Sequence, residues 1–87
     1  DVGSWQSIGR LTEPDEQGNC VHGKFLPIQS QRMIVYGDED HLLVTIGMQD
    51  TIVVHTDNAT LVAPKSEEER VREVVKQLKT RGWDQYL

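Results

Sequence analysis

Pairs of adjacent apolar residues recur every nine residues through the middle of the chain. The five doublets are Phe25-Leu26, Ile34-Val35, Leu43-Val44, Ile52-Val53 and Leu61-Val62. Polar segments rich in the residues that favour turns separate them, such as 37–40 and 47–50. β-Branched side chains crowd around the doublets, notably in 51–56, and they suit a pleated, half-buried surface. The pattern predicts about five short strands joined by short turns.

A nine-residue repeat is compatible with two mainly β architectures. One is an antiparallel meander or roll with tight turns, and the other is a coil in which two units make one 18-residue circuit of a parallel stack. A six-residue repeat would favour a left-handed parallel β-helix directly, but no clean repeat of that length stands out. The periodicity alone leaves both architectures open.

The pattern becomes helical after Pro64. Ser66 and Glu69 have the spacing of a capping box, and apolar residues then recur with the period of a helix, at Val71, Val74, Val75 and Leu78. Acidic residues precede basic ones along the segment, and Glu68 is placed to pair with Arg72. Gly82 is expected to end the helix. We expect the apolar tail, Trp83, Tyr86 and Leu87, to pack on the β body or on a neighbouring subunit.

Composition and charge exclude several classes of protein. The chain has 87 residues and a net charge of −5, and all of the excess acid lies in residues 1–65. Such a chain repels nucleic acid and anionic membranes, and it contains neither a transmembrane-length apolar run nor a signal peptide. We expect a cytoplasmic protein with one small core. Because little surface is buried in so small a domain, we also expect a homodimer that covers surplus apolar residues: Ile52, Val54, Val62, Val71 and Trp83.

No catalytic site is complete in the sequence. His22, His41 and His55 are far apart, so surface or strand positions explain them better than a metal site, although His55 could be partly buried. Cys20 lacks a basic neighbour that would stabilise a thiolate. The acidic run 38–40 has no EF-hand spacing and fits a solvent-facing turn. A glycine-rich phosphate loop and a nucleophile elbow are both missing, so no catalytic or cofactor-binding residue is assigned.

Two ordered stretches carry a resemblance to a known family. The chain opens with DVGSW at 1–5, and the order IG, DTIVV and TLVAPK follows over residues 46–65 before a charged helix. This arrangement resembles the C-terminal part of mannose-1-phosphate guanylyltransferases, over nearly the whole chain. The resemblance implies a short left-handed parallel β-helix of about five strands, followed by one C-terminal α-helix. It also implies an enzyme that makes GDP-mannose and pyrophosphate from GTP and mannose 1-phosphate.

The resemblance further implies that the chain is a fragment, inactive alone, that acts in domain packing or oligomerisation. Residues 1–23 would be the end of the catalytic domain and a connector, 24–65 the β-helix, and 66–87 the helix and tail. Asp1 matches the aspartate that helps to hold the catalytic Mg²⁺ with a second aspartate from the missing domain, and no cofactor is expected in the fragment itself. Trp5 and Ile8 would pack at the domain junction. The alternatives are a stand-alone β interaction module and, with less support, a regulatory domain that senses a nucleotide sugar.

Overall fold

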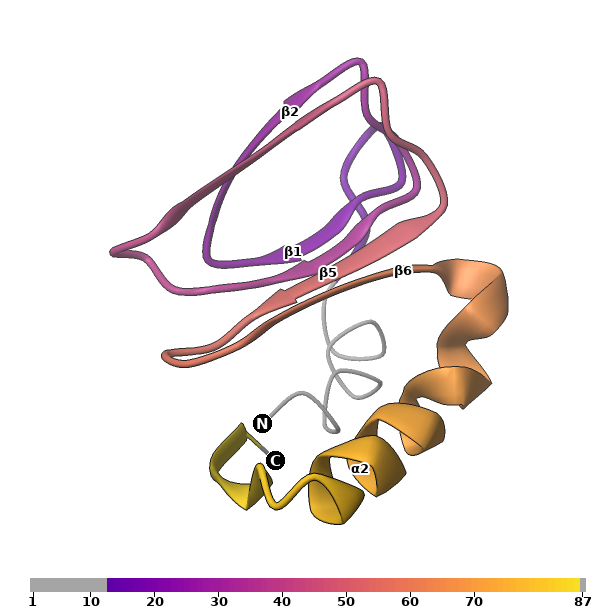
Figure 1. Cartoon of the computed structure of the whole chain (residues 1–87). Coiled ribbons are helices and arrows are strands. Elements are labelled where there is room, and N and C mark those ends of the chain that lie inside the picture. Colours follow the sequence, from indigo (N-terminus) through magenta and orange to yellow (C-terminus); the bar gives the residue numbers. More distant parts are fainter. Residues whose placement is uncertain (1–12, 87) are drawn as a thin grey trace.

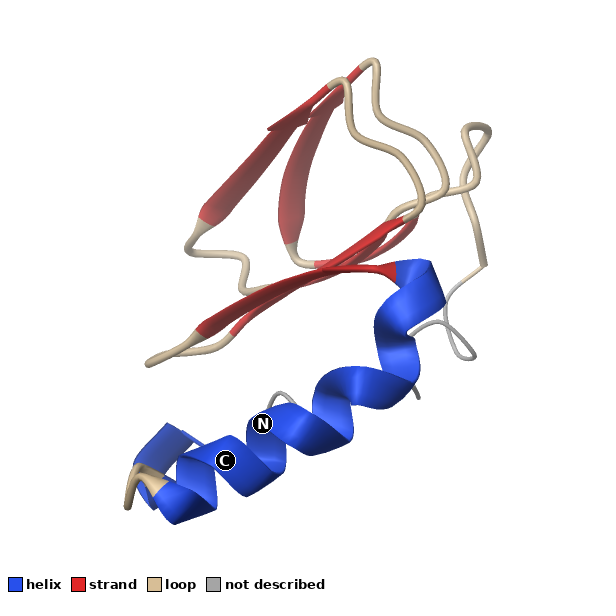
Figure 2. Cartoon of the chain, turned by 45° about the vertical axis from the view of Figure 1, so that its right-hand side comes forward, coloured by secondary structure: helices blue, strands red, loops and turns tan. Residues whose placement is uncertain are grey.

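The computed structural model describes residues 13–86, which form six strands, one α-helix and two 3₁₀ segments (Figures 1 and 2). Two sheets, A and B, contain all of the strands: A has the order β1-β3-β5-β6, and B has the order β2-β4. The helical elements η2, α2 and η3 follow the last strand. The strand bounds are β1 Cys20–His22, β2 Lys24–Ile28, β3 Ile34–Tyr36, β4 Leu42–Ile46, β5 Thr51–His55 and β6 Thr60–Pro64.

The first five strands form a parallel coil. Residues 18 apart lie side by side where β4 pairs with β2 and where β5 pairs with β3, as in Phe25 beside Leu43 and Val35 beside Val53. β3 pairs with β1 at a spacing of 14 residues. An isolated parallel bridge between Gln31 and Gln49 marks a third side of the coil, and the triangular outline is visible in Figure 2. Two nine-residue units therefore make one circuit, so the β-helical expectation is confirmed for this part of the chain.

The last strand reverses direction. β6 pairs with β5 in antiparallel register, with Val62 opposite Val53, across the turn 56–59. Thr56 closes this turn through a backbone bond of 2.9 Å to the Ala59 carbonyl. The antiparallel alternative is thus correct for the fifth doublet only. β1 lies within residues 1–23, the stretch expected to hold the end of the catalytic domain and the connector, and it pairs with β3.

Each of the first four doublets places one side chain inside the coil and one outside. Val35, Val53 and Met33 form a buried cluster inside the coil, against which Phe25 and Leu43 pack. On the outer face of sheet A, Ile52 and Val54 form a second buried cluster with Val71 of the helix. Ile52, Val54 and Val71 are therefore buried within a single chain and are not among the apolar residues left for a second subunit to cover, while the homodimer itself stays a prediction.

Buried polar groups join successive turns of the coil. Asn19 is almost fully buried, and its side chain accepts a hydrogen bond from the Met33 amide at 2.9 Å and donates one to the Ser30 carbonyl at 3.4 Å. The buried Ser30 hydroxyl accepts a bond from Thr45 Oγ1 at 2.7 Å. Because an unpaired buried polar group is costly, these bonds fix how the turns stack.

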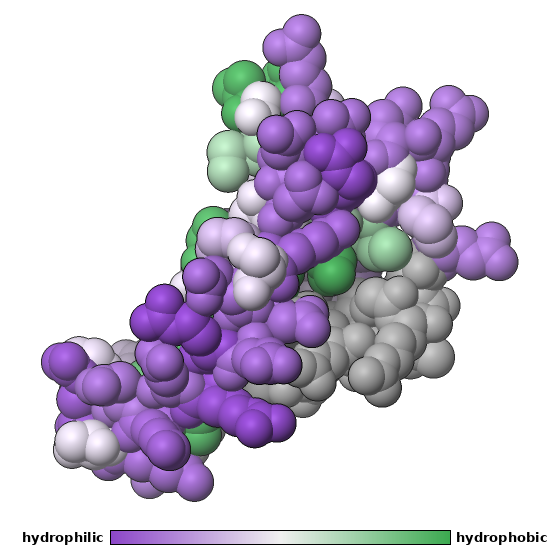
Figure 3. Space-filling model, turned by 90° about the vertical axis from the view of Figure 1, so that its right-hand side faces the viewer, coloured by the Kyte–Doolittle hydropathy of each residue, from purple (hydrophilic) through white to green (hydrophobic). Residues whose placement is uncertain are grey.

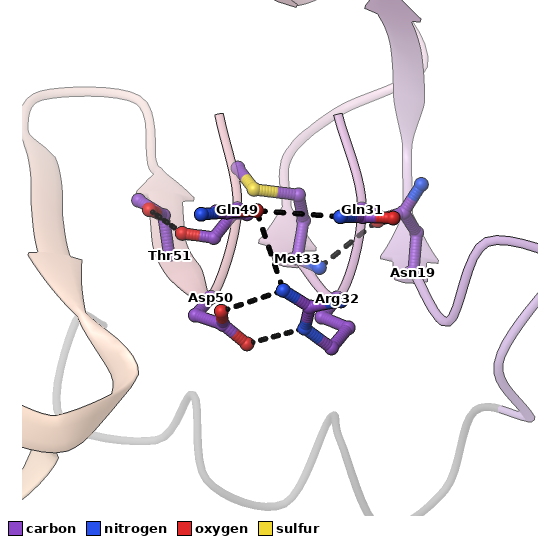
Figure 4. A network of polar contacts seen from close by, with 7 residues as sticks. All are labelled: Asn19, Gln31, Arg32, Met33, Gln49, Asp50 and Thr51. Carbon is purple, nitrogen blue, oxygen red and sulfur yellow. Dashed lines mark hydrogen bonds and ion pairs between the residues drawn. The ribbon is translucent and has the colours of Figure 1, made fainter. Parts of the chain in front are cut away.

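One corner of the coil repeats a left-handed backbone conformation. Gly18, Arg32 and Asp50, each two residues before a paired position of sheet A, have φ values of 79°, 54° and 52°. Figure 4 shows Arg32 reaching Asp50, with a distance of 2.8 Å between Nε and Oδ1. The hydrogen bond from Arg32 lowers the pKa of the Asp50 carboxyl. Both side chains are about half exposed, so the pair orders the corner more than it stabilises the fold.

The C-terminal helix begins later than the sequence suggests. Lys65–Arg70 form the 3₁₀ segment η2, and α2 spans Val71–Thr80. The capping box is wrong: Pro64 occupies the N-cap position and no side chain caps this end. Ser66 is already inside the first turn of η2.

The expected ion pair of Glu68 with Arg72 is also wrong. Arg70 pairs instead with Glu67 at 3.6 Å and with Glu73 at 3.1 Å. The hydrogen bonds from Arg70 lower the pKa of the Glu73 carboxyl. The kink at Glu67, with φ −104° and ψ 16°, changes which side chains share a face of the helix.

The end of α2 agrees with the sequence. Gly82 has a φ of 72°, and the Trp83 amide donates to the Leu78 carbonyl at 2.8 Å, as in a glycine-terminated helix. The tail continues into η3, Asp84–Tyr86, where the Gln85 carbonyl accepts a 2.8 Å bond from Asn58 of the β5–β6 turn. The tail is therefore held beside sheet A. Leu87 lies outside the described residues.

Candidate functional site

The coil brings the three histidines to one corner. His22 stacks on Tyr36 with ring centroids 4.8 Å apart, and its Nδ1 lies 3.3 Å from the Gly37 carbonyl. His41 and His55 stack almost parallel at 3.8 Å, and His55 Nδ1 lies 3.1 Å from Thr60 Oγ1. His55 is half-buried, as expected. The contact between His41 and His55 could not be predicted from the sequence, because it depends on the coil bringing together residues that are 14 positions apart.

These histidines do not complete a metal centre. Within residues 13–86, no group of three or more His, Cys, Asp or Glu side chains is placed to hold a metal ion. Cys20 is a half-buried free thiol, and Asp38, Glu39 and Asp40 are exposed in the turn before β4. Asp1, Trp5 and Ile8 lie outside the described residues, so the expected Mg²⁺ ligand and junction residues stay predictions.

An apolar groove lies between β6 and α2. It has a volume of about 450 Å³, and its lining includes Leu61, Val74, Leu78 and Trp83. Only Val71 of the helical stripe is buried, and Val74 and Leu78 line the groove without filling it. Trp83 stays half exposed beneath the Arg81 guanidinium, which lies 5.4 Å from the ring centroid. The helix therefore docks by its first turn, as Figure 2 shows.

Sheet B presents a second apolar surface. We use "the outer face of sheet B" for Leu26, Ile28, Leu42, Val44 and Ile46, which alternate with the inward-facing residues of β2 and β4. The exposed fraction reaches 68% at Ile46. The two rows lie side by side, with Leu26 beside Val44 and Ile28 beside Ile46. The side of the molecule that bears η2 is different, since hydrophilic residues cover most of it in Figure 3.

The geometry within residues 13–86 thus offers apolar surfaces for packing. Among these residues, no helix has the length and apolarity to cross a bilayer. The sequence profile of one domain family, described as the mannose-phosphate isomerase/GMP-like β-helix domain, matches residues 23–78. The chain belongs to this β-helix family.

Two bacterial biosynthetic proteins are similar to this chain over most of its length. The chain is 38% identical over 82 residues to the xanthan biosynthesis protein XanB of Xanthomonas campestris and 35% identical over 82 residues to the mannose-1-phosphate guanylyltransferase of Escherichia coli. Both matches cover 94% of the chain but only 17% of the relative.

A solved structure agrees with the sequence matches. The crystal structure of a protein described as mannose-1-phosphate geranyltransferase, from Thermus thermophilus, is 30% identical and superposes with a TM-score of 0.70. That match covers 90% of this chain and 24% of the Thermus chain. The chain thus spans about a sixth to a quarter of the length of the relatives it matches.

Proposed function

We propose that the chain is the C-terminal β-helix domain of a mannose-1-phosphate guanylyltransferase. The longer enzyme would make GDP-mannose and pyrophosphate from GTP and mannose 1-phosphate in the cytoplasm. The observation that carries the proposal is the match to relatives of that name over 94% of the chain, together with the shared β-helical fold. Groups that bind GTP and mannose 1-phosphate would belong to the remaining five-sixths of such an enzyme.

The catalytic Mg²⁺ would require both parts of the longer enzyme. Asp1, in the DVGSW sequence, would supply one carboxylate, and a second aspartate would come from the catalytic domain. Mg²⁺ takes one or two protein carboxylates together with phosphate oxygens and water, so one carboxylate from this chain fits its donor preference. When bound, the ion would neutralise charge on the triphosphate while the sugar phosphate displaces pyrophosphate.

The role of the β-helix domain would be to pack against the catalytic part. The groove between β6 and α2 supports this role because its apolar lining, including Leu61 and Val74, leaves surface that residues 13–86 do not fill. The helical stripe therefore has room for a partner from the longer protein. The Trp83→Ala substitution would lower the thermal stability of the longer enzyme while changing that of the 87-residue chain little.

The decisive experiment compares the chain with the longer enzyme. GDP-mannose formation from GTP, mannose 1-phosphate and Mg²⁺ is measured by chromatography. We expect activity from the longer enzyme and none from the 87-residue chain. In the longer enzyme, Asp1→Asn should reduce turnover at least ~10-fold, whereas Asp57→Asn, in the exposed β5–β6 turn, should not. Turnover by the chain alone would contradict the proposal.

The alternative is a stand-alone interaction module. The outer face of sheet B favours an interaction role, but it does not require that the chain work without a catalytic domain. The gene sequence upstream of Asp1 separates the two. A glycine-rich nucleotide loop encoded there would support the enzyme, and an upstream frame without one would support the module.

A further inference from the structure

We propose that residues 1–12 of this chain dock in the groove between β6 and α2, with Trp5 and Ile8 as the side chains that contact its apolar lining. The inference rests on the packing role proposed above for the groove, and it names the segment that fills the part of the groove next to Pro64. That part is bounded by β6 and by the first turns of α2.

The walls of the groove have the composition of a protein core. On one side, Leu61 of β6 packs on the buried cluster around Ile52, and on the other side α2 contributes Val74 and Leu78. Leu61, Val74 and Leu78 are only partly buried, and the space between the walls is about 450 Å³. A gap between apolar walls loses the packing contacts that its lining would otherwise make. The groove therefore favours an apolar segment as its occupant.

The sequence of residues 1–12 supplies such a segment. Small or polar residues separate apolar side chains that recur at every third position: Val2, Trp5, Ile8 and Leu11. Residues three apart lie on the same face of a helical segment, so neighbouring members of the series can enter a groove together. The charges of Asp1 and Arg10 offset each other. The segment is therefore neutral and apolar on one side, as the groove requires.

The described chain begins close to the mouth of the groove. The Gln17 carbonyl accepts a bond from the Arg32 amide at 3.0 Å, and one circuit further the Asp50 carbonyl accepts a bond from the Lys65 amide at 2.8 Å. Pro64, which precedes Lys65, lines the groove. These contacts cross three strand spacings of about 4.8 Å, so roughly 15 Å separates the corner at residue 17 from the mouth of the groove.

This distance is within reach of the preceding residues. Asp15 is held at the corner, where its carboxylate accepts a bond from the Asn19 amide at 2.9 Å. An extended chain spans about 3.3 Å per residue, so the seven residues from Asp15 back to Ile8 reach up to roughly 23 Å. A segment on so short a tether has an effective concentration in the millimolar range, which favours it over a separate partner. Trp83 lies at the opposite end of the groove, after α2, and stays available to the rest of a longer protein.

Disulfide trapping in the 87-residue chain tests the docking directly. In a Cys20→Ser background, Ile8→Cys combined with Val74→Cys should form an intramolecular disulfide under mild oxidation at about 10 μM, far below the effective concentration of a tethered segment. Ile8→Cys combined with Val44→Cys is the control, because Val44 is 48% exposed on sheet B, on the side of the coil away from α2 (Figure 1). Non-reducing electrophoresis and peptide mass spectrometry identify the products.

A substitution within the segment tests the same contact without cysteines. Trp5→Ala should lower the melting temperature of the 87-residue chain by roughly 4–8 °C, because it removes the aromatic side chain that fills the groove. It should also shift the NMR amide signals of Ala63 and Val74 and leave those of residues 42–46 unchanged. Gln6→Ala is the matched control, since Gln6 is the polar neighbour of Trp5. Far-UV circular dichroism confirms that each variant is folded.

Three results would overturn the proposal. The first is equal cross-linking of the 8/74 and 8/44 pairs, the second is a disulfide formed only between two copies, and the third is a Trp5→Ala variant that melts like Gln6→Ala. Each of these results would leave the assignment to a longer enzyme standing, because GDP-mannose formation by that enzyme is measured separately.

Discussion

Replacing Asn19 by alanine tests whether buried side-chain bonds fix the stacking of the coil. Asn19 is 1% exposed, and its amide group bonds the backbone of the next turn at both the Met33 amide and the Ser30 carbonyl (Figure 4 shows the Met33 bond). Alanine can neither accept the first bond nor donate the second. Two buried backbone groups would then lack their partner.

The expected loss of stability follows from these two groups. A buried group left unpaired costs about 1–3 kcal/mol. The Met33 amide should account for most of the loss, because its bond is 2.9 Å long, whereas the Ser30 bond of 3.4 Å is weaker. We expect Asn19→Ala to lower the free energy of unfolding by about 2–4 kcal/mol, out of a total of roughly 4–13 kcal/mol for a chain of this length.

Urea unfolding followed by far-UV circular dichroism measures this change. With a slope near 1 kcal/mol per M for a small domain, the midpoint should fall by about 2–4 M. Asn58→Ala is the control, because the Asn58 side chain also bonds a backbone carbonyl, that of Gln85, but is exposed. Its substitution should cost about 1 kcal/mol or less.

The aspartate variant gives a second measurement. Asn19→Asp keeps an acceptor for the Met33 amide but needs a proton to donate to the Ser30 carbonyl. Burial should raise the pKa of the new carboxyl, so its stability is greatest below pH 4 and is lost as pH rises toward neutrality. If Asn19→Ala costs no more than Asn58→Ala, or if Asn19→Asp lacks this pH dependence, the side chain does not hold the turns together.

Three further predictions concern the backbone and the charged corner. Gly47→Ala should lower the free energy of unfolding by about 1 kcal/mol through backbone strain alone, because its φ is 66° and an added Cβ meets no atom within 4 Å. Gln29→Gly, at the equivalent place one circuit earlier with a φ of 50°, should leave the free energy of unfolding unchanged or raise it, as measured by urea unfolding. Gly23→Ala should cost about 2–5 kcal/mol and broaden the NMR amide spectrum, since its Cβ would lie 2.5 Å from the Gly37 carbonyl group at a φ of 102°; wild-type stability would contradict this packing. The hydrogen bond from Arg32 lowers the pKa of Asp50, so the stability that the carboxylate adds is present above pH 4 and is lost as pH falls through the lowered pKa. Asp50→Asn should remove that part of the acid dependence of the thermal unfolding temperature. An unchanged acid dependence would argue against the ion pair in solution.

The repeat and the strands could be predicted from the sequence because each doublet marks a place where one side chain must be buried. Phe25 and Leu43 enter the core from sheet B just as Val35 and Val53 do from sheet A. The register of 18 residues is a multiple of the nine-residue spacing, so sequence alone could not separate the coil from a meander. Both occur, since β6 turns back on β5.

Contacts between turns of the coil could not be predicted in the same way. Asn19 lies in a polar stretch whose pattern predicts a loop, and only its position beside Met33 explains its burial. The stack of His41 on His55 likewise depends on coil geometry. The prediction of a capping box was wrong because η2 begins at Lys65, directly after strand β6, and this start places Ser66 inside the first turn. The outer face of sheet B had a signal in the apolar doublets, but which member faces solvent depends on the fold.

The reversal at β6 has a consequence for the length of this solenoid. In a solenoid each circuit contacts only its neighbours, so the stack ends where a segment prevents the next circuit from pairing with the last strand. The hairpin 56–59 and the helix that follows act as that stop, because they direct the chain across sheet A and away from a third circuit. Duplicating the 18 residues 37–54 ahead of the hairpin should therefore lengthen the coil by one strand spacing of about 4.8 Å and leave the same hairpin and helix at its end.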